Sequence, residues 1–243
     1  TTTISMLSAL IRPTAGSILI NGVSITDDSI EARRHIGIVP QEIALYPRLT
    51  ARQNLEFFGR MQGITGDALR ERVAELLEFV ELADRGEDRI ETFSGGMKRR
   101  VNIAAGLIHR PPILCMDEPT VGVDPQSRRR ILDLITHLRD EHGIAILYTT
   151  HLMEEAQELS DRVGIIDHGH LIAVGTQAEL TDLVNEYDRI ELELDERSEI
   201  DAYLEAIRRL DGVGEVREEG SEADVTASGA ARILILATNG RRL

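Results

Sequence analysis

The stretch ILCMDEPTVGVD, residues 113–124, places two adjacent carboxylates directly after an apolar segment of strand length. In open α/β sheets, ligands bind at the edge where the strands have their carboxyl ends. Asp117 and Glu118 diverge at such an edge, so one acid could hold the water shell of a magnesium ion while the other polarises an attacking water. The competing interpretation is a polar turn that closes the strand, and an isolated Asp-Glu-Pro sequence favours that turn.

The segments around this stretch predict an α/β fold. Short apolar runs of strand type occur in HIGIVPQ (residues 35–41), IAILYT (144–149) and RVGII (162–166), the last leading into a hairpin turn at His168-Gly169. All-apolar strands that alternate with helices are typical of a mostly parallel sheet covered on both faces. The helical stretch of about residues 50–110 interrupts this pattern as a subdomain.

The N-terminal segment predicts a helix followed by a turn. Ile4, Leu7 and Ile11 fall at helical spacing, and the helix is expected to stop before Pro13. The sequence GSILING then reads as a strand that closes on an Asn21-Gly22 turn.

Capping residues predict where other helices begin. Thr50 and Gln53 form a capping-box pattern before an apolar series. A second amphipathic helix is expected over about residues 67–80. Asp124 followed by Pro125 predicts a helix with these residues as its N-cap and first helical residue.

The chain changes character near residue 185. RIELELDE alternates strictly, a helix-type pattern follows, and short strand-type segments occur around residues 213–216 and 232–237. We therefore expect an α/β domain over residues 1–184 and a small α+β accessory region over residues 185–243. That region ends soon after a strong strand signal, so it is expected to be incomplete.

Composition limits the functional classes. The 243 residues carry 27 basic and 42 acidic side chains, a formal net charge of −15 that disfavours a general nucleic-acid binder. Cys115 is the only cysteine, so an internal disulfide is impossible and a reducing compartment is expected. No apolar run approaches the roughly 18–20 residues needed to span a bilayer. Work at a membrane would therefore require another polypeptide to span it.

A second chemistry-bearing segment is FSGGMKRR, residues 93–100, in which Ser94, Gly95 and Gly96 directly precede a helix pattern. A serine and two glycines at a helix N-terminus expose several backbone N–H groups at the positive end of the helix dipole, which suits an anion. An ordinary serine cap with flexible glycines is the equally weighted alternative.

Two further polar residues follow predicted strands. His151 lies just beyond the strand-type segment 144–148, and Gln41 ends GIVPQ. Taken alone, His151 is more often a helix cap than a catalytic group, and Gln41 is more often a loop residue. The ordered series from Gln41 through the serine-glycine segment and the paired acids to His151 is hard to produce by accident.

At this point the sequence resembles the nucleotide-binding subunit of ATP-binding cassette (ABC) transporters over about residues 1–180. The matching motifs are the Q-loop at Gln41, the signature FSGGM, Walker B in ILCMDE, the D-loop VGVD and the switch histidine His151. LYPRLTARQNL and DEPTVGVDPQSRRR look most like the ABC-2 branch, which exports drugs and polysaccharides. The resemblance implies a P-loop NTPase-type, mostly parallel sheet with a helical subdomain insert.

The resemblance also implies roles for the strand-end residues, with ATP and Mg²⁺ as the bound groups. Glu118 would be the general base for the attacking water, and Asp117 a magnesium ligand, usually through water. Gln41 would sense the magnesium ion and that water. His151 would contact the γ-phosphate.

Two subunits of this family close head to tail. Ser94 and the amides of Gly95 and Gly96 would bind the γ-phosphate held by the other subunit. Asp124 would couple the two sites across the dimer. These are expectations from the resemblance.

The first residues, TTTI, look like the tail of the phosphate-binding loop G-x-x-x-x-G-K-[ST] of the same family. By resemblance, Thr1 would be a magnesium ligand and Thr2 a phosphate contact. The chain would then be truncated within that loop, without its glycines and lysine. An innocent helix cap formed by the threonines is the alternative.

The sequence departs from the family pattern in two places. Phe93 and Met97 stand in the signature where leucine and glutamine are commonest, and Val123 stands in the D-loop where leucine is usual. Ser94 and the two glycines are intact, so we expect the anion-binding function to survive.

The resulting hypothesis is an ATPase subunit that powers a separate integral membrane permease as part of an exporter. It would be peripheral on the cytoplasmic face of the cell membrane, dimerise with a second nucleotide-binding subunit and bind no nucleic acid. The helical stretch would dock on the permease. The alternatives are a soluble ABC ATPase acting on ribosomes or nucleic acid, and a catalytically inert fragment with very weak ATP affinity.

Overall fold

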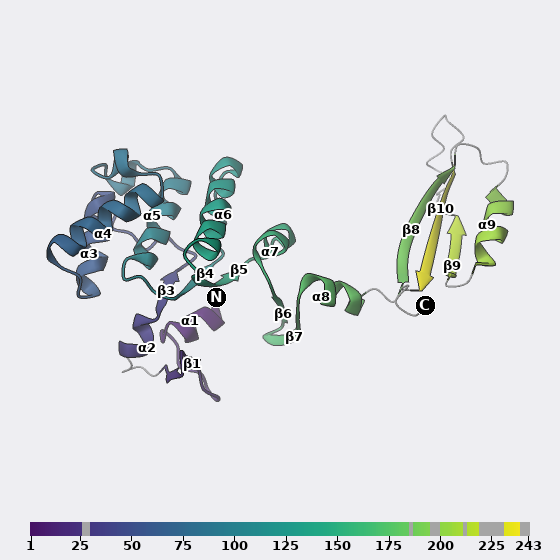
Figure 1. Ribbon diagram of the computed structural model, residues 1–243, viewed down its shortest axis with the longest axis horizontal. Coiled ribbons are helices and arrows are strands. Elements are labelled where there is room, and N and C mark those ends of the chain that lie inside the picture. The colour runs from purple at the N-terminus through teal and green to yellow at the C-terminus, as the bar shows by residue number, and fades with distance from the viewer. Residues whose placement is uncertain (26–29, 185–186, 195–199, 211–212, 219–230, 239–243) are drawn as a thin grey trace. The chain divides into compact units, whose positions relative to one another are not determined.

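The computed structural model describes residues 1–25, 30–184, 187–194, 200–210, 213–218 and 231–238 (Figure 1). The chain forms two compact units, Thr1–Ser160 and Asp161–Leu243. Each unit is described by itself. Where the ATPase-like domain ends along the sequence stays a prediction.

The first unit is built on a parallel sheet. Its strands are β3 (Ile36–Val39), β4 (Ile113–Asp117) and β5 (Ala145–Thr149), in the order β3-β4-β5. Both pairings are parallel, and the register sets Asp117 opposite Thr149. The predicted parallel arrangement is confirmed, and the carboxyl ends of all three strands meet at one edge.

Alternate residues of β4 face opposite layers, as the pleat of a strand requires. Leu114 and Met116 belong to a large core that contains residues of α5 (Gly95–Leu107) and α6 (Pro125–Asp140). Cys115 instead packs in a smaller cluster with Ile4 of α1 (Thr2–Leu7), and this burial raises the pKa of its thiol to about 11. Helices therefore cover both faces of the sheet (Figure 1).

Two glycines let α5 approach β3 closely. A Cβ atom on Gly37 would overlap the backbone oxygen of Gly106, and one on Gly106 would press against Val39 and the oxygen of Ile38. Larger residues here would push the helix off the sheet. The close approach fixes the position of the helix whose first residues carry the serine-glycine segment.

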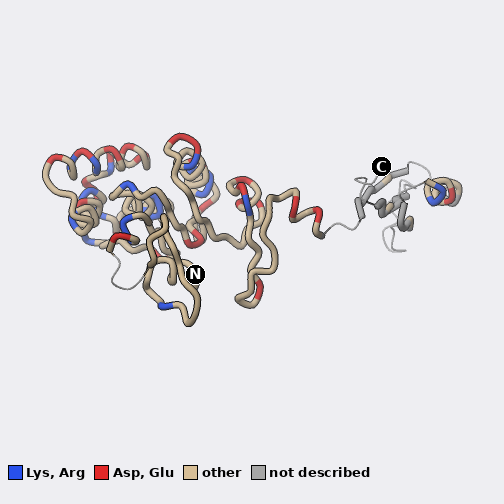
Figure 2. The backbone as a smooth tube through the Cα atoms, turned by 60° about the horizontal axis from the view of Figure 1, so that its bottom comes forward, with Lys and Arg blue, Asp and Glu red and all other residues tan. Residues whose placement is uncertain are grey.

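The predicted helical subdomain is present between β3 and β4. It contains α3 (Ala51–Met61), α4 (Gly66–Phe79), the short 3₁₀ helices η1 (Ala83–Arg85) and η2 (Ile90–Thr92), and α5. The capping box is confirmed, because Thr50 Oγ1 accepts a hydrogen bond from Gln53 N at 3.1 Å and Thr50 N donates to Gln53 Oε1 at 3.0 Å. In the first unit, Lys and Arg are interspersed with Asp and Glu along the helices (Figure 2).

The N-terminal helix is shorter than predicted. α1 ends at Leu7, and Ala9 takes a left-handed φ of 57°. Leu10 N donates to Ser5 O at 2.9 Å, which closes the helix, and the Leu10 side chain is 79% exposed. The apolar spacing that extended to Ile11 was therefore misleading, because the last part of the pattern does not pack on the core.

The segment after α1 forms the predicted turn and two short elements. β1 (Leu19–Ile20) and β2 (Val23–Ser24) pair antiparallel. Asn21 and Gly22 join them with φ values of 48° and 79°, a conformation that suits these two residues in a tight hairpin. α2 (Ile30–Arg34) then leads into β3.

The first unit ends with α7 (Met153–Leu159), and the described ranges of the second unit contain antiparallel strands and two helices. β6 (Val163–Asp167) and β7 (His170–Gly175) form the predicted hairpin about His168-Gly169, followed by α8 (Gln177–Val184). A further sheet has the order β8-β10-β9, and its elements are β8 (Tyr187–Leu194), α9 (Ile200–Arg208), β9 (Val213–Glu218) and β10 (Ala231–Thr238). The described part of residues 185–243 therefore has the predicted α+β character.

No helix in the described ranges combines the length and apolar character needed to cross a bilayer.

Candidate functional site

The paired acids lie at the carboxyl end of β4, where Thr149 of β5 organises both. Thr149 Oγ1 donates to Asp117 Oδ1 at 2.8 Å. The same oxygen accepts a hydrogen bond from Glu118 N at 3.1 Å, and Thr149 O lies 3.2 Å from that nitrogen. The register of two parallel strands thus fixes the Asp117 side chain and the Glu118 backbone through one residue.

Asp117 is a buried carboxylate held in its charged form. Its side chain is only 5% exposed, and the backbone nitrogen of Thr1 lies 3.3 Å from Oδ1. Burial by itself raises the pKa of Asp117, whereas hydrogen bonds from the side chains of Thr149 and Thr1 lower it, and the net shift is downward. An ionised oxygen donor is therefore present where the resemblance expects a magnesium ligand.

Glu118 has an unusual backbone conformation, and its carboxylate contacts different residues from those that contact Asp117. Its φ of 45° lies in the left-handed region, which costs a non-glycine residue about 1–3 kcal/mol. Gln41 Nε2 donates to Glu118 Oε2 at 3.4 Å, and His151 Nδ1 lies 3.3 Å from the same oxygen. We call Gln41, Glu118 and His151 the strand-end cluster.

Each member of the strand-end cluster follows a different strand. Gln41 comes after β3, Glu118 after β4 and His151 after β5. His151 is held between two neighbours, because Leu152 N donates to Thr150 Oγ1 at 3.0 Å just before α7 begins. The structure therefore brings together residues that are up to 110 positions apart in sequence, Gln41 to His151. Thr1 reaches the same place through Asp117.

The donor set beside Asp117 fits a magnesium ion bound together with a nucleotide. Within the described ranges, no three His, Cys, Asp or Glu side chains come close enough to hold a metal by themselves. Magnesium in phosphoryl-transfer sites needs only one or two carboxylates, since substrate phosphates and waters complete its shell. The ionised Asp117 meets that requirement, and the resemblance adds the oxygens of Thr1 and Gln41 as expected donors.

The serine-glycine segment lies at the start of α5. Ser94 is the N-cap, and its Oγ accepts a hydrogen bond from Met97 N at 3.2 Å, as expected for a serine cap. Gly96 packs against the first turn of α6, where a Cβ atom would overlap the side chain of Ser127. Gly95 has more room, since a Cβ atom on this residue would lie 3.8 Å from its nearest neighbour, Gly122 O.

Asp124 caps α6 beside this segment. Its Oδ1 accepts a hydrogen bond from Ser127 N at 3.0 Å, and the bonds from Ser127 lower the pKa of this exposed carboxylate. We call Ser94, Gly95, Gly96 and Asp124 the helix-start cluster. The helix-start cluster is joined internally through Ser127, and its described bonds do not extend to Glu118 or His151. Thr2, the remaining predicted residue, is exposed in the first turn of α1.

Sequence reasoning missed two residues that support the cluster. Arg99 of α5 is 4% exposed and donates to Pro40 O at 2.8 Å and Gln41 O at 2.5 Å. Glu155 of α7 is 1% exposed and accepts hydrogen bonds from several segments. Neither has a motif of its own, although Arg99 lies within MKRR and Glu155 lies four residues after His151.

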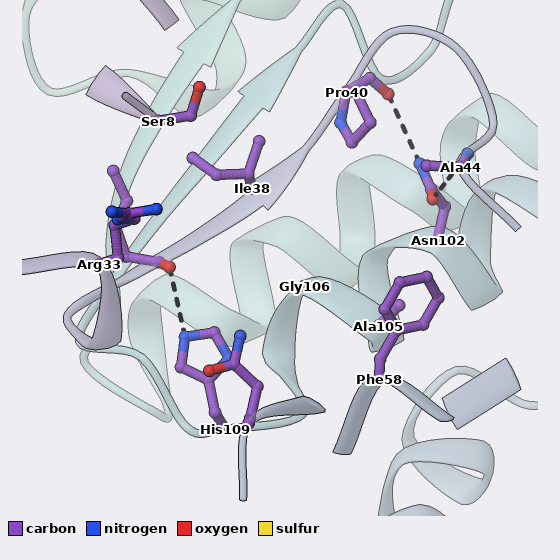
Figure 3. Close-up of a pocket in the computed structure, with 12 residues that line it drawn as sticks. Ser8, Arg33, Ile38, Pro40, Ala44, Phe58, Asn102, Ala105, Gly106 and His109 are labelled. Carbon is purple, nitrogen blue, oxygen red and sulfur yellow. Dashed lines mark hydrogen bonds between the residues drawn. The ribbon is translucent and has the colours of Figure 1, made fainter. Parts of the chain in front are cut away.

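A groove of about 250 Å³ lies beside the loop that carries Gln41 (Figure 3). Ile38 and Pro40 line it from the sheet side, and Phe58 and Asn102 line it from the helical subdomain. Asn102 fixes the loop, because Ala44 N donates to its Oδ1 at 3.3 Å and its Nδ2 donates to Pro40 O at 3.5 Å (Figure 3). The groove wall and Gln41 therefore belong to one bonded segment.

Comparison with known proteins places this geometry among ATP-binding proteins. The sequence model of the family described as ABC transporter matches residues 1–121. The chain is 48% identical to the linearmycin resistance ATP-binding protein LnrL of Bacillus subtilis (strain 168) over 229 residues. The matched region is 94% of this chain and 73% of LnrL. It is 46% identical to the doxorubicin resistance ATP-binding protein DrrA of Mycobacterium tuberculosis (strain ATCC 25618 / H37Rv) over 180 residues. The matched region is 74% of this chain and 54% of DrrA.

Two solved structures are similar over most of the chain. One is the dimeric post-hydrolysis state of the ATP-binding cassette MJ0796 bound to ADP and Pi, with a TM-score of 0.64 and 29% identity, covering 72% of this chain and 79% of that one. The other is cbiO1 from Clostridium perfringens, part of the ABC transporter complex cbiONQ, with a TM-score of 0.67 and 27% identity over 74% of each chain.

Proposed function

The chain belongs to the ABC transporter family of ATP-binding proteins, and from this premise we propose that it binds and hydrolyses ATP to power a separate membrane permease. The resemblance noted in the sequence and the P-loop NTPase-type fold are confirmed. The chain spans about three quarters of LnrL but only about half of DrrA, so the activity of the whole protein remains part of the proposal. The observation that carries it is the convergence of Gln41, Glu118 and His151 beside the ionised Asp117.

Glu118 is proposed as the general base of hydrolysis. Its carboxylate lies beyond the strand end, 29% exposed, and Gln41 and His151 contact one of its two oxygens. That arrangement leaves the other oxygen to accept a proton from a water molecule. Gln41 would orient the same water, while His151 would donate a hydrogen bond to the phosphate that is cleaved off. Positioning and charge stabilisation dominate phosphoryl transfer, so these contacts are the expected contribution of the protein.

Asp117 and the oxygens of Thr1 and Gln41 are proposed to hold Mg²⁺. When bound, the ion would neutralise charge on the phosphates of ATP. Asp117 suits this role because it is ionised and because Thr149 prevents its side chain from rotating away. Thr2, in the first turn of α1, is proposed to contact phosphate.

The helix-start cluster is proposed to serve a second copy of the chain. Ser94 and the amides of Gly95 and Gly96 lie at the positive end of the α5 dipole, which favours an anion. Asp124 would couple the two ATP sites. The dimeric form of the similar MJ0796 structure supports a head-to-tail pair in this chain.

The helical subdomain is proposed to dock on the permease, with the groove beside Gln41 as its contact. The groove combines apolar walls from Ile38 and Phe58 with polar groups of Asn102. A permease segment seated there would touch the loop that positions Gln41. The resistance functions in the names of LnrL and DrrA support an exporter of antibiotic-like compounds, with this subunit peripheral on the cytoplasmic face of the membrane.

The test is Glu118→Gln in the protein expressed from its complete gene with its permease. ATP hydrolysis should fall by about 10²–10⁴-fold, the usual contribution of a general base, while ATP binding and dimerisation persist. Glu154→Gln is the matched control, because Glu154 is a 90% exposed carboxylate of the same chain. Hydrolysis at the wild-type rate in Glu118→Gln would refute the proposed base.

A further inference from the structure

Glu155 is a buried carboxylate that accepts four hydrogen bonds. Its side chain is 0% exposed, although it lies only one residue from the exposed Glu154. Oε1 accepts from Thr120 Oγ1 at 2.7 Å and from Arg128 Nε at 2.8 Å. Oε2 accepts from Tyr148 OH at 2.8 Å and from Thr150 Oγ1 at 2.7 Å. Every donor is within normal hydrogen-bond range, so the carboxylate is fully used.

The four donors come from the segments that carry the candidate site. Thr120 lies in the loop between Glu118 and Asp124, and Arg128 lies in the first turn of α6, which Asp124 caps. Tyr148 is on β5 and Thr150 directly precedes His151. The Glu155 side chain therefore bonds to the loop that follows Glu118 and to the residue that directly precedes His151.

The bonds at Thr150 determine where His151 can lie. The Thr150 hydroxyl donates its one proton to Glu155, and its oxygen accepts from Leu152 N at 3.0 Å. His151 thus lies between Thr150 and Leu152, which are joined through the Thr150 hydroxyl group. Loss of the Glu155 acceptor would let that hydroxyl group rotate and would weaken its bond to Leu152 N.

Charge in the network is balanced in the folded protein. Burial raises the pKa of Glu155, but the hydrogen bonds from Thr120, Thr150 and Tyr148 and the charge of Arg128 outweigh it and lower the pKa. Burial, together with the bond to Glu155, raises the pKa of Tyr148, which therefore keeps the proton it donates. At neutral pH, Glu155 is therefore ionised and accepts hydrogen bonds, while Tyr148 is protonated and donates one.

We propose that Glu155 is a positioning residue that holds His151 against Glu118 and fixes the loop leading to Asp124 in the same bonded unit. This inference rests on the proposed ATPase function of the site, because it assigns Glu155 a part in that reaction through His151. Glu155 contacts neither ATP nor the attacking water. A displacement of the loop at Asp124 by a second copy of the chain would reach His151 through Thr120 and Glu155.

The first test does not use activity. In protein labelled with ¹⁵N-histidine, His151→Ala identifies the His151 side-chain signals among those of the seven histidines. Glu155→Gln should shift the His151 signals, because an amide cannot accept from all four donors and directs N–H groups at some of them. Glu154→Gln, with its side chain in solvent, should leave them in place. Unchanged His151 signals in a folded Glu155→Gln protein would overturn the proposal.

The second test separates positioning from simple stability. Glu155→Gln should lower kcat by about 10- to 100-fold with little change in KM for ATP, since a catalytic group would be displaced while the nucleotide contacts remain. In a His151→Ala background the same substitution should cost almost nothing more. Equal losses in both backgrounds would show that Glu155 does not act through His151.

Two further measurements keep the outcomes distinct. Should Glu155→Gln fail to fold, Thr150→Val keeps the buried carboxylate and removes only the hydroxyl group, and it should reproduce the His151 shift and the loss of kcat. Wild-type hydrolysis in Glu118→Gln would defeat the proposed function while the histidine signals still report on the Glu155 network. A failure of the histidine test with an inactive Glu118→Gln would defeat the positioning role alone.

Discussion

The strand-end cluster and the helix-start cluster are held by different forces. Gln41, Glu118 and His151 come from three segments, and the side chains of Gln41 and His151 both contact Glu118 Oε2. Ser94 and Asp124 instead cap the helices that they precede, and Gly96 is fixed by close packing against Ser127. The first cluster depends on polar bonds across the fold, whereas the second depends on the steric fit between α5 and α6.

This difference bears on the proposal that the helix-start cluster serves a second copy of the chain. In the strand-end cluster, the amide of Gln41 and the imidazole of His151 both contact the acid, Glu118. In the helix-start cluster, the described bonds of the capping side chains stay within their own helices. The proposed role of the helix-start cluster is therefore to complete a site on another copy of the chain.

The largest expected effect comes from mixing two inactive variants. Glu118→Gln removes the base of a chain's own site, and Ser94→Arg should block the site of the other copy by filling the anion position. A mixed pair then contains one site with both defects and one with neither. Random pairing in a two-fold dimer should restore roughly a quarter of wild-type hydrolysis from two preparations that are each nearly inactive.

The matching control for that mixture puts both substitutions in the same chain. Mixed with wild-type protein, the double variant leaves no mixed pair with an intact site, since each site then contains one defect. Hydrolysis should then come only from wild-type pairs. Both mixtures should therefore show roughly a quarter of wild-type hydrolysis. A first mixture that stays inactive, with roughly half of wild-type hydrolysis in the second, would contradict a site shared between copies.

A smaller effect is expected from adding one methyl group to the helix-start cluster. In Gly96→Ala the new Cβ would overlap Ser127, and overpacking of this kind costs about 1–3 kcal/mol. Gly95→Ala is the matched control, because its Cβ would approach only Gly122 O at 3.8 Å and alanine favours a helix by about 1 kcal/mol over glycine. Chemical denaturation should therefore show opposite signs for the two neighbours.

Ser127→Gly provides the rescue for that comparison. It removes the side chain that the new methyl group would meet but keeps the backbone N–H that donates to Asp124. The double variant Gly96→Ala with Ser127→Gly should regain most of the lost stability. A Gly96→Ala protein as stable as Gly95→Ala would show that packing at Ser127 does not fix this cluster.

The fold was predictable where short sequence signals determine local structure. Residues no more than four positions apart determine three of these features, which are the capping pair Thr50 and Gln53, the N-cap Asp124 and the Asn21-Gly22 turn. The parallel sheet followed from apolar strands separated by helices. The end of α1 at Leu7 was not predictable, because it depends on whether Leu10 finds a core to pack against, and it does not.

The candidate site was predictable as a list of residues but not as a network. The motifs selected Glu118 and His151, yet nothing in sequence shows the left-handed φ of Glu118 or the shared oxygen that joins it to Gln41 and His151. Glu155 was overlooked because one acid in an amphipathic helix usually faces solvent. Its burial is decided by Thr120 and Tyr148, which reach it only after the chain has folded.

The smallest predicted effect concerns stability in acid, and it tests whether polar bonds to Glu155 hold the segments of the strand-end cluster together. The pKa of Glu155 in the folded protein lies below its ordinary value of 4.5. Its contribution to stability is therefore fully present above about pH 4.5 and is lost as the pH falls through the folded pKa, because the unfolded chain binds the proton first. Glu155→Gln should flatten that part of the stability curve in urea titrations from pH 7 to pH 3, whereas Glu154→Gln should keep the wild-type slope. The slope should not vanish, since the pKa of Asp117 is lowered as well. Parallel stability-versus-pH curves for Glu155→Gln and wild type would mean that the ionised Glu155 does not hold the strand-end segments together. The contrast with the helix-start cluster, which is fixed by packing, would then be lost.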